Sequence, residues 1–560
     1  MAIKLLPPDL LTTSAPITRL LSLALTPVLF ATILIALTYL YTTLRYRLAL
    51  PHHLSTTNDA GKLSPQPPPH IPYALPFLGS ALSFLNPVPG GYWKGLLAFH
   101  PHASGACTLL LGGKTTYVLF SPSAVTQLFK SRGTSRMVFN MQVMEKGFGM
   151  SKEGVRKYWG FDDPENGAEH HQEKIWQDYL LKTEVVNELT GEFVGTLRHE
   201  LEEELKDGGA KEVGLYEWLR GHMFAASTAT FFGRRILEMY PSLGEDFFAF
   251  DRQMLSMFFG IPKLFILKAY KSRKKVLDGM EEWHVKMMEE CKNNPADPET
   301  VKWEPVYGSR ANRARQHFYG RRGFTMRGRA SLDLGFLFGI SSNAIPATGW
   351  MLMHILDPKA DAMLYRDVME ELKSAVNKDG TLNIPELMSL PLLQSILHEV
   401  LRLYVDILIT RELFEDLDLP IDDGKRRIAL KKGGLVMAPS WLSHRDESLW
   451  VDPPCETFYA RRFLKVDPET GKQIFSTGGT AGKFFPFGGG KSICPGRVFA
   501  KQEVLACLAM VLLGFEFEAL GYVEESGRKR DKFPTLRHGY SGSGTVVMDG
   551  DVKVRMKRRQ

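Results

Sequence analysis

The segment FPFGGGKSICPGR, residues 485–497, constrains the fold of this chain more strongly than any other stretch. Its three successive glycines allow a tight backbone turn that exposes amide groups. Cys494 follows this turn and stands before an apolar run, residues 498–513, whose pattern predicts a helix. The positive end of that helix and the nearby amides favour an ionised sulfur, the form that binds a metal ion such as iron. The alternative is a buried cysteine that only packs against the turn.

The spacing F-x-x-G-x-x-x-C-x-G within this segment resembles the heme-binding loop of the cytochrome P-450 family. The resemblance implies a heme b cofactor whose iron takes Cys494 as its axial thiolate, the ligand that favours cleavage of dioxygen in this family. It also implies that the ring of Phe487 packs near the sulfur. Gly490 and Gly496 would then be the positions where the backbone approaches closely.

A second pattern lies upstream of the cysteine. Glu399 and Arg402 are three residues apart in a predicted helix and therefore share one face of it. Further on, the segment ETFYARRF, residues 456–463, is similar to the family's P-E-x-F-x-P-x-R-F sequence. The resemblance implies that Arg462 joins Glu399 and Arg402 in a buried structural network beneath the heme. The match is partial, because cysteine and alanine replace two prolines of the pattern.

The helix expected at residues 332–356 departs from the family pattern at the positions that deliver protons in most members. Most members carry A-G-x-D/E-T there, and the acid and the hydroxyl help to deliver protons during oxygen activation. Here Ser342 replaces the acid and Asn343 replaces the threonine, so these two become the expected catalytic residues. Pro346 has no N–H, so the carbonyl of Ser342 loses its helix partner and is free to accept a proton. An asparagine that only kinks the helix is the alternative.

The asparagine followed by A-I-P-A resembles the sterol 7α- and 12α-hydroxylase and prostacyclin synthase branch of the family, and Ser492 agrees with this assignment. That branch contains hydroxylases that activate dioxygen and an isomerase that rearranges a peroxide without an electron supply. The leading hypothesis is a monooxygenase that oxidises an apolar small molecule, such as a sterol, a terpenoid or another secondary metabolite. A redox-independent isomerase or dehydratase acting on a peroxide is the second hypothesis, and a non-catalytic heme- or lipid-binding membrane protein is the third.

Heme propionates need cationic partners, and Ser492 stands where the family usually has a basic residue. Arg411 matches the family position of one propionate contact. Lys174 stands near the expected place of the family's W-x-x-x-R motif, although a solvent-facing Lys174 is an equally good interpretation.

The segment before Arg411 is expected to line the substrate pocket, together with Gly339. Its side chains predict an apolar ligand, namely Ile407, Leu408 and Ile409. Three basic residues flank the thiolate side, where the family docks NADPH-cytochrome P-450 reductase: Lys491, Arg497 and Lys501. Plain solvent exposure explains these three as readily.

A charge-free apolar run, residues 20–41, precedes all these motifs. As a helix this run would reach about 33 Å, enough to cross a hydrocarbon core of about 30 Å. It is longer than the apolar part of a cleaved signal peptide and ends in aromatic and basic residues, which favours a retained anchor. The sequence therefore predicts a single-pass membrane protein in contact with a lipid bilayer. The resemblance adds the endoplasmic reticulum, with the catalytic domain on the cytoplasmic side.

The remaining chain is predicted to form one catalytic domain, residues 73–560, because no second linker and no internal repeat follows. Residues 1–19 would be an N-terminal tail and residues 42–72 a basic, proline-rich linker. The expected fold class is mainly α with small β-sheets, the cytochrome P-450 fold, preceded by an N-terminal transmembrane helix. Helices are expected at 176–205, 361–376, 387–403 and 498–513, and short strands at 108–111, 116–120, 427–430 and 552–555.

The composition excludes some classes of protein. A formal charge of +7 is small beside 69 basic and 62 acidic residues, which argues against a nucleic-acid-binding protein. Five scattered cysteines make neither a disulfide framework nor a C-x-x-C pair, as expected in a reducing compartment. The stretch 310–329 carries seven arginines and is expected to be an exposed loop. Contact of that stretch with lipid head groups or an acidic partner is the alternative.

Overall fold

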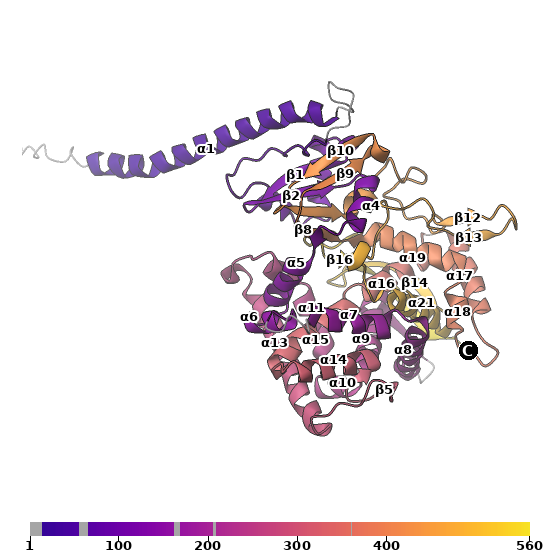
Figure 1. Cartoon of the computed structure of the whole chain (residues 1–560). Helices are drawn as coiled ribbons and strands as arrows, with labels where there is room; N and C mark the ends of the chain where they lie inside the picture. The colour runs from indigo at the N-terminus through magenta and orange to yellow at the C-terminus, as the bar shows by residue number, and fades with distance from the viewer. Residues whose placement is uncertain (1–13, 55–64, 162–167, 205–208, 360, 560) are drawn as a thin grey trace, which may run out of the picture.

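The computed structural model describes residues 14–54, 65–161, 168–204, 209–359 and 361–559. Figure 1 shows a strand-rich part beside the N-terminal helix α1 and a larger part made of packed helices. The mainly α fold with small sheets is therefore confirmed. The longer helices of the body are α7 (Ala168–Leu180), α8 (Thr183–Glu203), α9 (Leu215–Phe232), α13 (Leu267–Glu290), α14 (Arg310–Arg321), α15 (Met326–Ser341), α16 (Ala344–Ile355), α17 (Ala362–Ser374), α19 (Pro391–Tyr404) and α21 (Arg497–Gly514).

The largest hydrophobic core lies among these helices, and α21 runs through it with most of its side chains buried. Helix α21 packs on α8 and α16, so the loop that precedes α21 is held by the centre of the molecule. The helix predicted at residues 176–205 is interrupted, because Lys182 between α7 and α8 has an extended backbone.

The two largest sheets among the described residues have five and four strands. The first has the order β1-β2-β11-β8-β3, with only β2 and β11 parallel, and the second has the order β15-β14-β17-β4. Short strands predicted from the sequence are found in both. Their bounds are β1 (Ala106–Leu111), β2 (Lys114–Leu119), β3 (Thr134–Ser135), β8 (Leu408–Leu413), β11 (Leu435–Pro439), β4 (Ala210–Gly214), β14 (Phe515–Glu524), β15 (Lys529–Arg530) and β17 (Gly550–Arg558).

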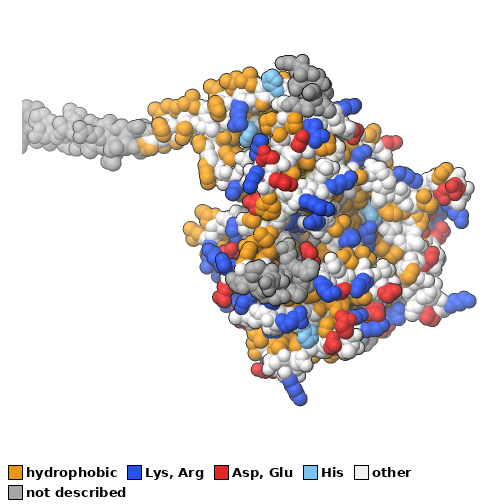
Figure 2. Space-filling model, in the orientation of Figure 1, with side chains coloured by type: hydrophobic (Ala, Val, Ile, Leu, Met, Phe, Trp, Pro, Cys, Tyr) orange, Lys and Arg blue, Asp and Glu red, His pale blue; other side chains and the backbone are white. Residues whose placement is uncertain are grey.

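Helix α1 (Ser14–Leu54) projects from the body (Figure 1), and Figure 2 shows hydrophobic side chains along its described outer part. Its segment Pro27–Leu54 is long and apolar enough to cross a membrane by length and composition. The helix continues beyond residue 41, into the range predicted as linker. Buried Tyr46 explains this, because its hydroxyl bonds to Nδ1 of His100 in the body at 3.0 Å. The first part of the predicted linker is therefore helical and docked.

The arginine-rich stretch 310–329 is not an exposed loop, and that prediction was wrong. It forms α14 and the start of α15, with Arg313 and Arg315 buried. Arg315 pairs with the buried carboxylate of Asp333 at 2.8 Å, and Arg313 donates to backbone carbonyls. These partners compensate the charges, so the arginines tie α14 to its neighbours rather than facing lipid or solvent.

Candidate functional site

The cysteine loop is a tight structure clamped between α21 and α4 (Pro122–Lys130). The Cys494 N–H donates to the carbonyl of Phe487 at 2.9 Å, which closes the loop on itself. Gly490 has φ +63°, and a Cβ there would overlap the carbonyl oxygen of Phe129 in α4. The glycine is thus needed for close approach to α4. Gly496 precedes α21, and a Cβ on it would lie 3.9 Å from the Cys494 sulfur.

The groups around the Cys494 sulfur act on its pKa in opposite directions. Burial, the largest effect, raises the pKa of the thiol above its ordinary value. The amides of Gly496 and Arg497 and the charges of Arg497 and Arg136 lower it. The amides at the start of α21 therefore lower the pKa of the thiol as predicted, but the increase caused by burial is larger. A bound metal cation is the usual means by which a buried thiol is held ionised.

Arg411 lies in β8 beside this loop and is buried, with 4% of its surface exposed. Its guanidinium donates to the carbonyl of Gly489 at 2.7 Å and to that of Leu128 at 3.1 Å. Its Nε is buried and has no hydrogen-bond partner among the described residues. Arg411, which the sequence predicted to bind a propionate, is thus a buried cation beside the loop with one N–H that lacks a hydrogen-bond partner among the described residues.

Arg136, which the sequence motifs did not reveal, lies next to Arg411. The positive charge of Arg136 acts on both neighbours, since it lowers the pKa of Arg411 and also that of Cys494. The Arg136 guanidinium lies 5.7 Å from the ring of Phe139, and its buried Nε has no partner among the described residues. No carboxylate in the described part of the chain pairs with Arg136 or Arg411. A buried cation and a partly buried one, both without such a partner, form a site for an anionic group.

Lys174 lies elsewhere, on α7, with 69% of its side chain exposed. It pairs with Asp178 one turn later at 2.9 Å, an ordinary surface ion pair along a helix. Lys174 therefore faces solvent, the alternative given by the sequence. The cation near the cysteine loop is Arg136.

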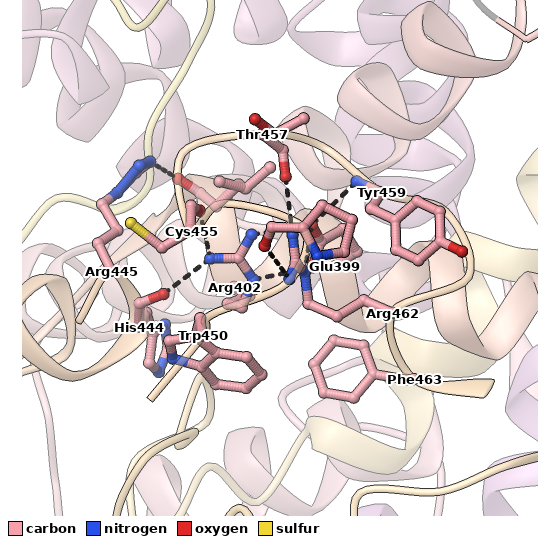
Figure 3. Close-up of polar contacts among 12 residues, drawn as sticks. Glu399, Arg402, His444, Arg445, Trp450, Cys455, Thr457, Tyr459, Arg462 and Phe463 are labelled. Atoms are coloured by element: carbon pink, nitrogen blue, oxygen red, sulfur yellow. Dashed lines mark hydrogen bonds and ion pairs between the residues drawn. The ribbon is translucent and has the colours of Figure 1, made fainter. Parts of the chain in front are cut away.

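Glu399, Arg402 and Arg462 are brought together as a buried network (Figure 3). Both guanidiniums bond to the Glu399 carboxylate at 2.8–3.0 Å, and the Tyr459 N–H adds a further bond at 3.0 Å. Arg402 also donates to the carbonyl of Cys455 at 2.6 Å. The backbone carbonyl at this position serves as acceptor whatever the side chain, which explains how cysteine can replace the family's proline.

The single helix expected at residues 332–356 is divided in two, because α15 ends at Ser341 and α16 begins at Ala344. The side chain of Asn343 in this break accepts from the Thr545 N–H at 2.9 Å. Thr545 belongs to β16 (Gly544–Thr545), which pairs with β7 (Val405–Asp406). Asn343 therefore fixes two short strands beside the helix break, and its NH₂ group keeps its donor capacity.

Ser342, also in the break, uses its hydroxyl differently. The hydroxyl donates to Oδ1 of Asp251 at 2.9 Å. Asp251 ends α11 (Leu243–Asp251), a helix that no functional motif had marked. Sequence reasoning therefore missed this carboxylate.

The predicted pocket residues alternate along β8 and the turn before it. Ile409 is buried with its side chain near Gly488 of the cysteine loop, and Leu408 points to the opposite side, near Gly542. Ile407 is partly buried, and Gly339 on α15 is exposed with open space where a Cβ would stand. Of these residues Ile409 therefore faces the cysteine loop, whereas Leu408 faces away from it.

A cavity of about 540 Å³ lies on the outer side of the cysteine loop. Lys501 reaches into this region and places its Nζ 3.3 Å from Nε2 of His398 in α19. Lys491 is exposed on the loop itself. The cavity is lined by basic and aromatic residues that include Lys130, Arg497, Lys501, Phe484 and Phe487.

A model of the cytochrome P450 family matches residues 69–530 of this chain. The cytochrome P450 monooxygenase calL of Penicillium decumbens is 31% identical over 470 residues, covering 80% of this chain and 85% of the relative. The cholesterol 7-alpha-monooxygenase of Cricetulus griseus is 27% identical over 360 residues, covering 61% of this chain and 66% of the relative. Among solved structures, retinoic acid bound cyanobacterial CYP120A1 has the same fold, with a TM-score of 0.58 at 18% identity, covering 89% of this chain and 100% of the other.

Proposed function

We propose that this chain, which belongs to the cytochrome P450 family, is a monooxygenase that oxidises an apolar small molecule with dioxygen and electrons supplied by a reductase. Monooxygenase activity and a heme cofactor with a cysteine thiolate ligand come with the family. The finer assignments are proposals. The observation that carries them is the loop in which Cys494 lies beside buried Arg411 and partly buried Arg136, neither of which has a carboxylate partner among the described residues.

The residues around the loop fit heme b. Cys494 would hold the iron, and the packing of Phe487 and Gly490 would keep the loop closed against α4. Arg411 and Arg136 would bind the propionates, which supply the negative charge that these cations lack. When bound, heme supplies the site where dioxygen is activated, and thiolate ligation favours cleavage of its O–O bond.

Substitution of the two arginines tests this assignment. Arg411→Ala and Arg136→Ala should each weaken heme retention by about tenfold or more, since a hydrogen bond to a charged group is worth about 1.5–3 kcal/mol. Heme transfer to excess apomyoglobin, followed by absorbance, measures the loss. Lys174→Ala should transfer heme at the wild-type rate. Faster loss from Lys174→Ala than from the two arginine variants would reverse the assignment.

We assign the substrate pocket to Gly339, Ile407, Leu408 and Ile409, and the substrate to apolar molecules of the sterol, terpenoid or other secondary-metabolite type. The apolar side chains of Ile407, Leu408 and Ile409 support this class, because pockets for small molecules are lined mostly by hydrophobic side chains. The name cholesterol 7-alpha-monooxygenase, carried by one relative, is consistent with a substrate of this kind. Deletion of the gene in its native host, followed by a search for the accumulating intermediate, would identify the molecule.

Within this pocket we assign Ser342 and Asn343 to catalysis. Pro346 has no N–H to donate to the Ser342 carbonyl, and Asn343 lies next to that carbonyl at the break between α15 and α16. These groups can hold and orient a proton donor at the open side marked by Gly339.

The basic surface around the outer cavity supports docking of an acidic NADPH-cytochrome P450 reductase. Lys491 is exposed, and Lys130, Arg497 and Lys501 line the cavity beside the loop. Such a surface attracts an acidic partner over a distance of several ångströms and orients it.

We place the protein in the membrane of the endoplasmic reticulum, anchored by α1 with its catalytic domain, residues 73–560, on the cytoplasmic side. The exposed apolar side chains of α1 support anchoring (Figure 2). Leu264 and Phe265 of the body are also exposed, by 76% and 77%, as expected of side chains that enter a lipid surface.

Dependence on electrons separates the proposed reaction from isomerisation of a peroxide. With the accumulated intermediate as substrate, product should form only when NADPH, reductase and dioxygen are all present. One oxygen atom from ¹⁸O₂ should appear in the product by mass spectrometry. Complete turnover of a peroxide without reductase, with no label incorporated, would instead establish the isomerase.

A further inference from the structure

A carboxylate from a different helix reaches the break between α15 and α16. Asp251, at the end of α11, accepts the hydroxyl hydrogen of Ser342 at 2.9 Å. Ser342 stands where the family pattern has an acid on the broken helix itself. The carboxylate that the family pattern has at this position is thus supplied here by Asp251 of another helix, which is hydrogen-bonded to Ser342.

Both polar and apolar side chains surround this pair. A cavity of about 20 Å³ adjoins both side chains, which is room for about one water molecule. Its wall combines the apolar residues Phe248, Pro346 and Val547 with polar ones, namely Tyr216, Arg220, Asp251, Arg252, Ser342 and Arg537. A water there would have several polar partners, which an ordered water requires.

The cavity lies beneath a charged surface. Arg252 and Arg537 both pair with Glu525, at 3.4 and 3.5 Å, and all three side chains are at least partly exposed. Arg220, the remaining cation of the wall, pairs with Glu217 on its own helix. Arg252 and Arg537 therefore connect the surface ion pairs with the cavity beside Asp251.

Asp251 has acid strength suited to proton transfer near neutrality. Burial, the largest effect, raises the pKa of its carboxyl to about 6. The hydrogen bond from Ser342 and the charges of Arg537 and Arg252 act in the opposite direction. A carboxyl of this kind loses and regains its proton readily between about pH 5 and 7.

We infer that Asp251 supplies protons through Ser342 to the oxygen being reduced in the pocket. In each transfer, the Asp251 carboxyl gives its proton to the Ser342 oxygen while Ser342 releases its own hydrogen toward the pocket. Asp251 then regains a proton from solvent through the small cavity, so the pair returns to its starting state. The electrons come from NADPH through the reductase. This inference rests on the proposed monooxygenase function, and it makes Asp251 a positioning residue that acts through Ser342.

Proton supply controls whether dioxygen is reduced to hydrogen peroxide or onward to water and product. In the reconstituted system of heme-loaded protein, reductase and NADPH, the measurement is peroxide released per NADPH consumed, followed across pH 5 to 8. For the wild type this ratio should rise as pH rises through about 6, because Asp251 loses its proton there. For Asp251→Asn it should be several-fold higher at the acidic end and should lose this pH dependence. Ser342→Ala should behave in the same way.

The matched control is Glu245→Gln, an exposed carboxyl on the same helix, which should keep the wild-type profile. If Asp251 only holds α11 against the helix break, the pH profile of Asp251→Asn should run parallel to that of the wild type. That result would overturn the inference. The carbon-monoxide spectrum of each ferrous variant distinguishes a failure of the proposed function from a failure of the role given to Asp251. A wild type without the band of a thiolate-bound heme contradicts the proposed function, whereas intact bands with parallel profiles contradict only the role of Asp251.

A second measurement does not depend on turnover. Infrared difference spectra of the heme-loaded protein between acidic and neutral pH should contain a carboxyl band with a midpoint near 6. This band should disappear in Asp251→Asn and move to higher pH in Ser342→Ala, where the hydrogen bond that stabilises the carboxylate is lost. A midpoint near the ordinary aspartate value of about 3.9 would contradict the inference.

Discussion

Glu399→Gln should destabilise the folded protein by about 3–5 kcal/mol, because removal of one member of a buried charge network leaves its partners uncompensated. The side chains of Glu399 and Arg402 are 0% exposed, and that of Arg462 is 5% exposed. Glutamine has nearly the same shape but carries no charge, so two buried guanidiniums would face a neutral amide. Their remaining bonds go to backbone carbonyls, which satisfy donors but do not neutralise charge.

The urea concentration at half-unfolding, followed by tryptophan fluorescence, measures this loss. Glu370→Gln is the matched control, since its side chain is 68% exposed and its ion pair with Arg366 is long, at 3.8 Å. A surface pair of this kind is worth about 0–1 kcal/mol, so the control should unfold close to the wild type. Equal midpoints for the two variants would show that the network does not stabilise the fold.

Cys494→Ser should abolish monooxygenase turnover and leave the fold in place. A serine hydroxyl has nearly the same size as the thiol but does not provide the thiolate that the reaction needs. The loop should persist, because the Cys494 N–H bond to Phe487 and the contact of Gly490 with α4 involve the backbone. Product formation with reductase and NADPH, together with far-ultraviolet circular dichroism, checks both parts.

Cys291→Ser serves as the control for this substitution. Cys291 is a second free, partly exposed cysteine, and its thiol donates to the backbone carbonyl of Met288 at 3.6 Å. The variant should retain activity. Turnover by Cys494→Ser, or an equal loss in both variants, would remove Cys494 from the centre of the site.

The sequence predicted those parts of the site that depend on local motifs. The cysteine loop needs its glycines for backbone reasons, and Glu399 and Arg402 share one helix face, so both are visible in the linear chain. The missing helix donor at Pro346, inside α16, is also a local feature, because proline lacks an N–H wherever it stands.

Other parts depend on contacts between segments that are far apart in the chain. Arg136 follows α4 in a stretch without a recognisable pattern, and it approaches Cys494 only because β3 joins the sheet that contains Arg411. Asp251 meets Ser342 across 91 residues of sequence. Lys174, in contrast, fitted a spacing but lies at the surface.

The arginine-rich stretch shows how composition can mislead. Seven arginines in twenty residues suggest solvent, yet Arg313 and Arg315 are buried. Their compensation comes from Asp333 and from carbonyls of other segments, and these partners exist only in the folded chain. Burial of charge is therefore a property of tertiary structure that residue counts do not reveal.

The most direct test of the account is the absorbance spectrum of the reduced, carbon monoxide-bound protein. Cys494 as the axial ligand predicts the red-shifted Soret band that thiolate ligation produces, and it predicts loss of that band in Cys494→Ser with retention in Cys291→Ser. A wild-type Soret band without the red shift would contradict the assignment of Cys494 as the ligand of the heme iron.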